Sequence, residues 1–103
     1  MATFEIRRES DCATVVPTGD VVASSVRELR PAMRDLVRSG VHEMVFDLSQ
    51  TQMIDSTGIG LLLSAYNSIS KTGGKISVVQ ASAEILDLLR TMRIHQHFSV
   101  SGR

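Results

Sequence analysis

The chain places three helix-capping residue types side by side, at Asp55, Ser56 and Thr57. Side-chain oxygens of such residues accept hydrogen bonds from the free amides in the first turn of a helix. Gly58 and Gly60 follow and leave the neighbouring backbone uncovered. A hydroxyl group at the exposed N-terminus of a helix is open to a phosphate group or to a partner protein. We therefore expect Ser56 to be the functional residue of this segment. The alternative is that Ser56 only caps the helix.

The motifs of common enzymes do not fit this segment. A dinucleotide-binding fingerprint would need glycine at position 63, which is Leu63. A nucleophile elbow would need glycine two residues before Ser56, and that residue is Ile54. Asp47 and Asp55 flank the end of a strand, but Asp47 suits the binding of loop amides better than acid–base catalysis. We expect no catalytic residues and a protein that is not an enzyme.

Metal-binding and redox groups are sparse in the sequence. Cys12 is the single cysteine, which excludes an internal disulfide and a site built from several thiolates. His95 and His97 would need metal ligands from elsewhere in the chain, so a solvated position near the chain end is favoured. We expect neither a metal ion nor a cofactor.

The composition is that of an ordinary globular domain. The chain has 103 residues with a formal net charge of zero, so no broad positive field favours nucleic acid or an anionic membrane. The N-terminal residues lack the apolar run of a signal peptide, and no segment approaches the ~20 apolar residues of a membrane span. The sequence predicts one domain, residues 1–103, located in the cytoplasm.

Periodicity predicts a first half with two strands and a helix. Residues 4–8 alternate apolar and polar side chains as a half-buried strand does, and residues 13–16 continue as the second strand of a hairpin. A loop is expected from about residue 19 to residue 24. Ser25 and Glu28 have the spacing of a capping box. Because an interior proline disrupts a helix, Pro31 predicts an irregular first turn and a regular helix from about Pro31 to Ser39.

The second half alternates strands and helices. Strands are expected at 44–48, 76–79 and 98–100, with helices after residue 55 and over 83–93. Residues 101–103 are expected to be a loose end. The predicted inner faces of the two helices are Ile59, Leu62, Leu63, Tyr66 and Ile69, and Ile85, Leu88, Leu89 and Met92. Residues 61–63 form a turn of the helix that is apolar on every side. We therefore expect one side of this turn to remain exposed for a partner. This order of elements predicts an α/β sandwich with mostly parallel strands.

In combination, four segments strongly resemble a STAS domain. They are Thr-Gly-Asp at 18–20, Val-Phe-Asp-Leu at 45–48, Ile-Asp-Ser-Thr-Gly-Ile-Gly-Leu-Leu at 54–62, and Gly-Gly-Lys-Ile at 73–76. More specifically, they look like segments of bacterial anti-sigma factor antagonists, and the resemblance covers about residues 4–100. The resemblance implies a mixed, mostly parallel sheet of about five strands with an N-terminal antiparallel hairpin, covered by about three to four helices. It also implies a C-terminal helix, which in this sequence is short or missing.

The resemblance also implies a function. Ser56 takes the place of the family's phosphorylated serine, and the partners are an anti-sigma factor that is also a serine kinase, with an ATPase fold like that of histidine kinases, and a PP2C-type phosphatase. Phosphorylation would release the antagonist from the kinase. The expected partner-binding residues are Asp20, Val22, Ser24, Asp55, Ser56, Thr57, Gly58, Gly60 and Leu61. Val22 departs from the family pattern, which has an acidic residue there. The alternative function is a STAS scaffold or accessory subunit of a stress-signalling or transport complex, without a phosphoswitch.

Overall fold

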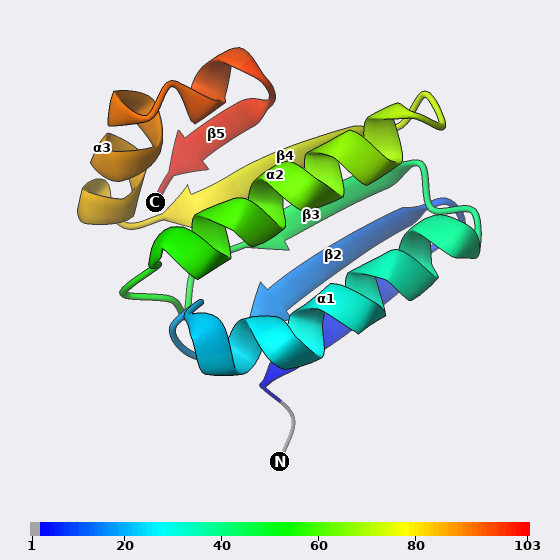
Figure 1. The fold of residues 1–103 in the computed structure, drawn as a ribbon, viewed down its shortest axis with the longest axis horizontal. Helices are drawn as coiled ribbons and strands as arrows, with labels where there is room; N and C mark the ends of the chain where they lie inside the picture. The colour runs from blue at the N-terminus through cyan, green and yellow to red at the C-terminus, as the bar shows by residue number, and fades with distance from the viewer. Residues whose placement is uncertain (1–2) are drawn as a thin grey trace.

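Five strands form one mixed sheet in the computed structural model, which describes residues 3–103 (Figure 1). The strands are β1 Phe4–Glu9, β2 Cys12–Pro17, β3 Glu43–Asp47, β4 Lys75–Ala81 and β5 Ser99–Gly102. They lie in the order in which they occur along the chain. β1 and β2 pair antiparallel and the other neighbours pair parallel, so the predicted fold class is confirmed.

Three α-helices and one short 3-10 helix connect the strands. They are α1 Ala23–Arg38, α2 Ser56–Ser70, α3 Ala83–Thr91 and the 3-10 turn Ile94–Gln96. Figure 1 shows α1 and α2 side by side across one face of the sheet, with α3 at the edge beside β5. The parallel strands require these crossovers, and the crossovers bury one sheet face.

The core lies between the sheet and the pair α1 and α2. It contains the fully buried side chains Val15, Leu29, Val41, Met44, Phe46, Leu48, Leu61, Leu62, Ile69, Val78, Leu89 and Ile94. Burial alternates along β3, where Met44 and Phe46 point inward and Val45 is half-buried. The opposite face of the sheet therefore remains partly open to solvent. The strand expected to be half-buried at residues 4–8 is more exposed than its pattern indicated, because β1 lies at the edge of the sheet and pairs only with β2.

The predicted break of the first helix at Pro31 is wrong. α1 is continuous from Ala23 to Arg38 and holds Pro31 in its interior. A proline removes one N–H donor, which leaves the carbonyl group of Arg27, four residues earlier, without its helical partner. Arg27 and Pro31 are both exposed, so water can hydrate that carbonyl group. Five buried side chains on the inner face hold the rest of the helix in place.

The predicted capping box of α1 is also displaced. The helix begins after Val22, whose N–H group donates to the hydroxyl oxygen of Ser25 at 3.0 Å. The expected loop to residue 24 is therefore shorter than predicted. Glu28 does not reach back to the helix start; its carboxylate accepts a hydrogen bond from Thr3. Ser25 plays the role that was expected of Glu28, since it is the third residue of the helix.

Two further predictions about helix faces and the chain end are wrong. Leu88 and Met92 were assigned to the inner face of α3, but 37% and 49% of their surfaces are exposed. Leu63 and Tyr66 of α2, by contrast, are half-buried and pack against the core, in agreement with their assignment to the inner face. Residues 101–103 are not loose, because β5 extends to Gly102 and the N–H group of Arg103 donates to the carbonyl oxygen of Ala81.

Candidate functional site

Asp55, not Ser56, caps helix α2. Its backbone is extended, and its carboxylate accepts a hydrogen bond from the N–H group of Gly58 at 3.0 Å. Asp55 thus satisfies one of the free amides of the first turn, and its negative charge lies at the positive end of the helix dipole. Because Asp55 performs the capping, Ser56 is not the cap of this helix.

Ser56 is the first residue of α2 and is exposed to solvent. Its hydroxyl group makes no hydrogen bond to any group within residues 3–103. Gly60, one turn further along the helix, is also exposed, and a Cβ atom built there would meet nothing within 4 Å. Ser56 therefore lies on a part of the helix where neither a side chain nor a loop covers the surface.

Two loops meet directly before Ser56. The carboxylate of Asp20, after β2, accepts hydrogen bonds from the N–H groups of Gln52 and Met53 at 3.3 and 3.1 Å. Val21 donates its N–H group to the carbonyl oxygen of Met53 at 3.0 Å. Asp55 in turn donates its N–H group to the carbonyl oxygen of Val21 at 3.3 Å. The loop after β2 thus fixes the segment that leads into α2.

Arg103 fixes the same segment from the other end of the chain. Its guanidinium group donates hydrogen bonds to the carbonyl oxygens of Leu48, Ser49 and Thr51 at 2.9, 3.0 and 3.1 Å. The same side chain also donates to the carbonyl oxygen of Gln80 at 3.0 Å. No motif marks this residue in the sequence, because its partners are backbone groups far from it along the chain.

The other predicted partner-binding residues lie on both sides of the start of α2. Asp20 and Ser24 are exposed and Val22 is half-buried, and all three line one shallow hollow beside the start of α1. Thr57 is half-buried and lines a second hollow together with Arg27 and Arg30 of α1. The loop with Asp20 and Val22 is thus bonded through Val21 to the segment before Ser56, and Thr57 directly follows Ser56. Their contact with a partner stays a prediction.

Gly58 and Leu61 lie underneath this surface. Only 1% of the surface of Leu61 is exposed, since the side chain packs between α1 and α2. The apolar run 61–63 therefore keeps Leu61 and Leu62 inside, and only Leu63 is partly accessible. A Cβ atom at Gly58 would overlap the carbonyl oxygen of Val21. Both residues position α2 from below, and neither adds a side chain to the surface around Ser56.

The residues weighed for catalytic or metal chemistry can be located in the fold. Asp47 accepts a hydrogen bond from the N–H group of Ser49 at 2.9 Å, as expected of a residue that binds loop amides. Within residues 3–103, no three His, Cys, Asp or Glu side chains are grouped to bind a metal ion. Over the same part of the chain, no helix combines the length and apolar character needed to cross a bilayer.

Comparison with known proteins gives the family and the fold. The family model described as STAS domain matches residues 3–102. A Thermotoga maritima protein described as an anti-sigma factor antagonist is 18% identical over 97% of this chain and 86% of its own, with a TM-score of 0.90. Unphosphorylated SpoIIAA is 14% identical over 97% of this chain and 87% of its own, with a TM-score of 0.77. The phosphorylated form of SpoIIAA, a cell fate determinant of Bacillus, is 13% identical over 97% of this chain and 91% of its own, with a TM-score of 0.79. At these identities the likeness shows a shared fold.

Proposed function

Since the chain belongs to the STAS domain family, we propose that it is an anti-sigma factor antagonist that is switched by phosphorylation of Ser56. In its unphosphorylated form it binds an anti-sigma factor that is also a serine kinase with an ATPase fold like that of histidine kinases. Transfer of phosphate to Ser56 releases the complex, and a PP2C-type phosphatase restores the binding form. The protein itself is a non-catalytic binding module of the cytoplasm.

The exposed, unbonded hydroxyl group of Ser56 carries this proposal. A kinase must bring the hydroxyl oxygen of its substrate in line with the γ-phosphate, so that oxygen has to be accessible. Ser56 meets this requirement in the folded domain, since its side chain is exposed and Asp55 performs the capping. No local unfolding of α2 is needed for the transfer.

The domain can accept a phosphate at Ser56 without changing its fold. A phosphate group adds about 1.5 to 2 negative charges at pH 7. At the first turn of a helix the free amides and the dipole favour such a charge by about 0.3–1 kcal/mol, and repulsion from Asp55 opposes this gain. The chain is about as similar to phosphorylated as to unphosphorylated SpoIIAA, with TM-scores of 0.79 and 0.77, which supports a switch without refolding.

The interface with the partner is where the added charge acts. Burying an unpaired charge against a partner surface costs several kcal/mol. Each ~1.4 kcal/mol lowers affinity tenfold, so one phosphate is sufficient to dissociate a complex of moderate affinity. The bare helix surface at Ser56 and Gly60 permits the close approach on which this penalty depends.

The deciding experiment incubates the purified protein with the candidate kinase and ATP and maps the phosphate by mass spectrometry. We expect a single phosphorylated residue, Ser56. Ser56→Ala should remain unmodified and bind the kinase constitutively, whereas Ser56→Asp should weaken binding about tenfold or more. Ser70→Ala, at an exposed serine of the same helix, is the matched control and should behave as the wild type.

A scaffold subunit without a switch would give a different result. Its binding would be unaffected by Ser56→Asp, and the kinase would leave Ser56 unmodified. That pair of results would overturn the proposed phosphoswitch.

A further inference from the structure

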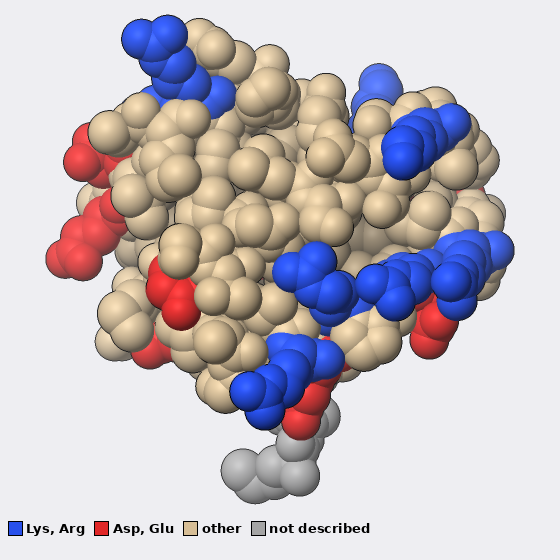
Figure 2. All heavy atoms as spheres, in the orientation of Figure 1, with Lys and Arg blue, Asp and Glu red and all other residues tan. Residues whose placement is uncertain are grey.

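Helix α1 carries a stripe of arginines on its surface. Arg27, Arg30, Arg34 and Arg38 recur every three or four residues, so they lie on neighbouring turns. Figure 2 shows basic side chains gathered along the position of α1. Among residues 3–103, none of the four arginines forms an ion pair. The ion pair found in that part of the chain joins Arg7 and Glu5. The helix thus presents a row of positive charge that the described part of the chain does not neutralise.

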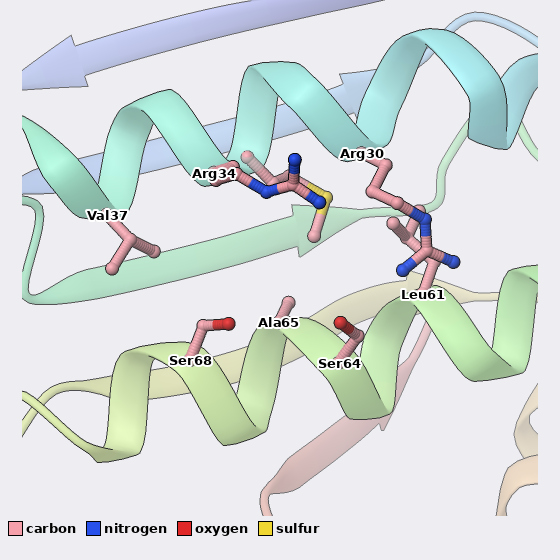
Figure 3. A pocket seen from close by; sticks show the side chains of 8 residues that line it. Arg30, Arg34, Val37, Leu61, Ser64, Ala65 and Ser68 are labelled. Atoms are coloured by element: carbon pink, nitrogen blue, oxygen red, sulfur yellow. The ribbon is translucent and has the colours of Figure 1, made fainter.

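The stripe borders a groove between α1 and α2. Figure 3 shows the side chain of Arg30 extending from α1 toward α2 and that of Arg34 lying along α1, with Ser64 and Ser68 on the opposite wall. The floor is apolar and consists of Met33, Val37, Leu61 and Ala65. The hollow has a volume of about 80 Å³, whereas sites for small organic ligands measure ~300–1,000 Å³. The groove therefore suits a few apolar side chains flanked by acidic groups, not a cofactor.

Helix α3 presents the complementary chemistry on another side of the molecule. Leu88 and Met92 lie one turn apart and are 37% and 49% exposed. Glu84 and Asp87 are exposed on the same helix beside them and form no ion pair within the described residues. Figure 2 shows acidic side chains at the position of α3, away from the basic row along α1. α1 carries four arginines against Glu28 and Asp35, and α3 carries Glu84 and Asp87 against Arg90, so the two helices have opposite net charge.

From this complementarity we propose that the α1–α2 groove of one molecule binds helix α3 of a second copy. Glu84 and Asp87 pair with Arg30 and Arg34, and Leu88 and Met92 lie over the groove against Val37, the half-buried residue of its floor. Arg30 and Arg34 are ~6 Å apart along the axis of α1, and Glu84 and Asp87 are ~4.5 Å apart along the axis of α3, a difference that the long arginine side chains can span. This inference goes beyond the proposed phosphoswitch and does not rest on it.

The contact is head-to-tail, because two different surfaces meet. A head-to-tail contact that does not close into a ring produces open chains of molecules. A single helix in a groove buries little area, so the association is weak and depends on concentration. Its charge pairs are exposed to solvent, so it also weakens as salt is added.

The test measures self-association of the full chain by sedimentation velocity. At ~1 mM protein and ~0.02 M NaCl we expect an average mass well above that of one chain, falling to the monomer at ~0.5 M NaCl. Arg30→Glu/Arg34→Glu should be monomeric at low salt, since like charges then meet across the contact. Lys71→Glu/Lys75→Glu makes the same change in net charge outside the groove and should associate as the wild type does.

Two combinations of variants separate this contact from any other mode of association. Adding Glu84→Arg/Asp87→Arg to the Arg30→Glu/Arg34→Glu chain swaps both charges and should restore association. A mixture of Arg30→Glu/Arg34→Glu with Leu88→Gln/Met92→Gln keeps one intact contact, so it should form 1:1 dimers and nothing larger. A wild-type chain that stays monomeric at low salt, or a charge swap that fails to restore association in a folded chain, overturns the proposal.

Discussion

The backbone of Gly58 packs directly against the carbonyl oxygen of Val21. A Cβ atom at position 58 would overlap that oxygen and would approach Cγ1 of Ile54 to 2.6 Å. The same carbonyl oxygen accepts a hydrogen bond from Asp55, and Val21 forms a parallel bridge with Ile54. The N-terminus of α2 is therefore seated on the loop after β2, and a bare glycine backbone permits that contact.

Gly58→Ala should destabilise the domain. The methyl group has no space between two loops, and overpacking of this kind costs typically ~1–3 kcal/mol. The measurement is urea denaturation followed by circular dichroism. Gly60→Ala is the matched control: with nothing within 4 Å of its Cβ position, alanine should raise the free energy of unfolding by ~0.5–1 kcal/mol. Equal effects of the two substitutions would contradict the contact with Val21.

Asp55→Ala should lower stability through the loss of the helix cap. Removal of an N-cap side chain costs ~0.5–2 kcal/mol. Asp55→Asn keeps an oxygen that can accept the hydrogen bond from Gly58, so its unfolding free energy should remain within ~0.5 kcal/mol of the wild type. Thermal unfolding of both variants tests this difference. A large loss in the asparagine variant would mean that the charge, and not the cap, stabilises α2.

Arg103→Ala should loosen the loop that leads to Ser56. The guanidinium group holds the carbonyl oxygens of Leu48, Ser49 and Thr51. We expect faster amide hydrogen exchange at residues 49–53 and a loss of stability of ~1 kcal/mol, the net contribution of a typical hydrogen bond. Arg7→Ala, at an exposed arginine of β1, is the control and should leave exchange in that loop unchanged.

Cys12 should need a higher pH than a free cysteine to react with thiol reagents. Desolvation raises the pKa of this thiol above its ordinary value, and repulsion from Glu43, Asp11 and Glu9 adds to the effect. Glu43 lies opposite Cys12 in the β2–β3 pairing. The pH midpoint of alkylation should therefore exceed the ~8.5 of a free cysteine, and Glu43→Gln should lower it only in part. Because the folded-state pKa is the higher one, stability from this group is present at neutral pH and declines as the pH rises above the unfolded value. A midpoint at or below that of a cysteine peptide contradicts this assignment.

Local chemistry made much of the fold and the site predictable. Alternation of strands and helices predicted the parallel sheet, and the cluster at Asp55, Ser56 and Thr57 located the start of α2. The prediction at Pro31 was wrong because it applied a fixed energetic penalty to an interior proline. That penalty does not consider that the carbonyl group left unpaired by the proline is exposed to water. Sequence periodicity also assigned Leu88 and Met92 to the core, since it cannot tell which apolar face a neighbouring element covers.

Features that depend on distant contacts could not be predicted in the same way. Arg103 binds backbone carbonyl groups, which carry no sequence signature. The arginine stripe of α1 was present in the spacing of the sequence, but a net charge of zero concealed it. The groove that the arginine stripe borders forms only when α2 packs beside α1.

The order of the strands in the sheet has a consequence for synthesis of the protein. Each strand pairs with the strand made just before it, so the sheet can grow stepwise as the chain emerges from the ribosome. Arg103 comes 55 residues after Leu48, the first carbonyl group that it holds. A nascent chain that has formed α2 thus carries Ser56 before its supporting loop is fastened. The loop before Ser56 gains these hydrogen bonds only after β5 has been made.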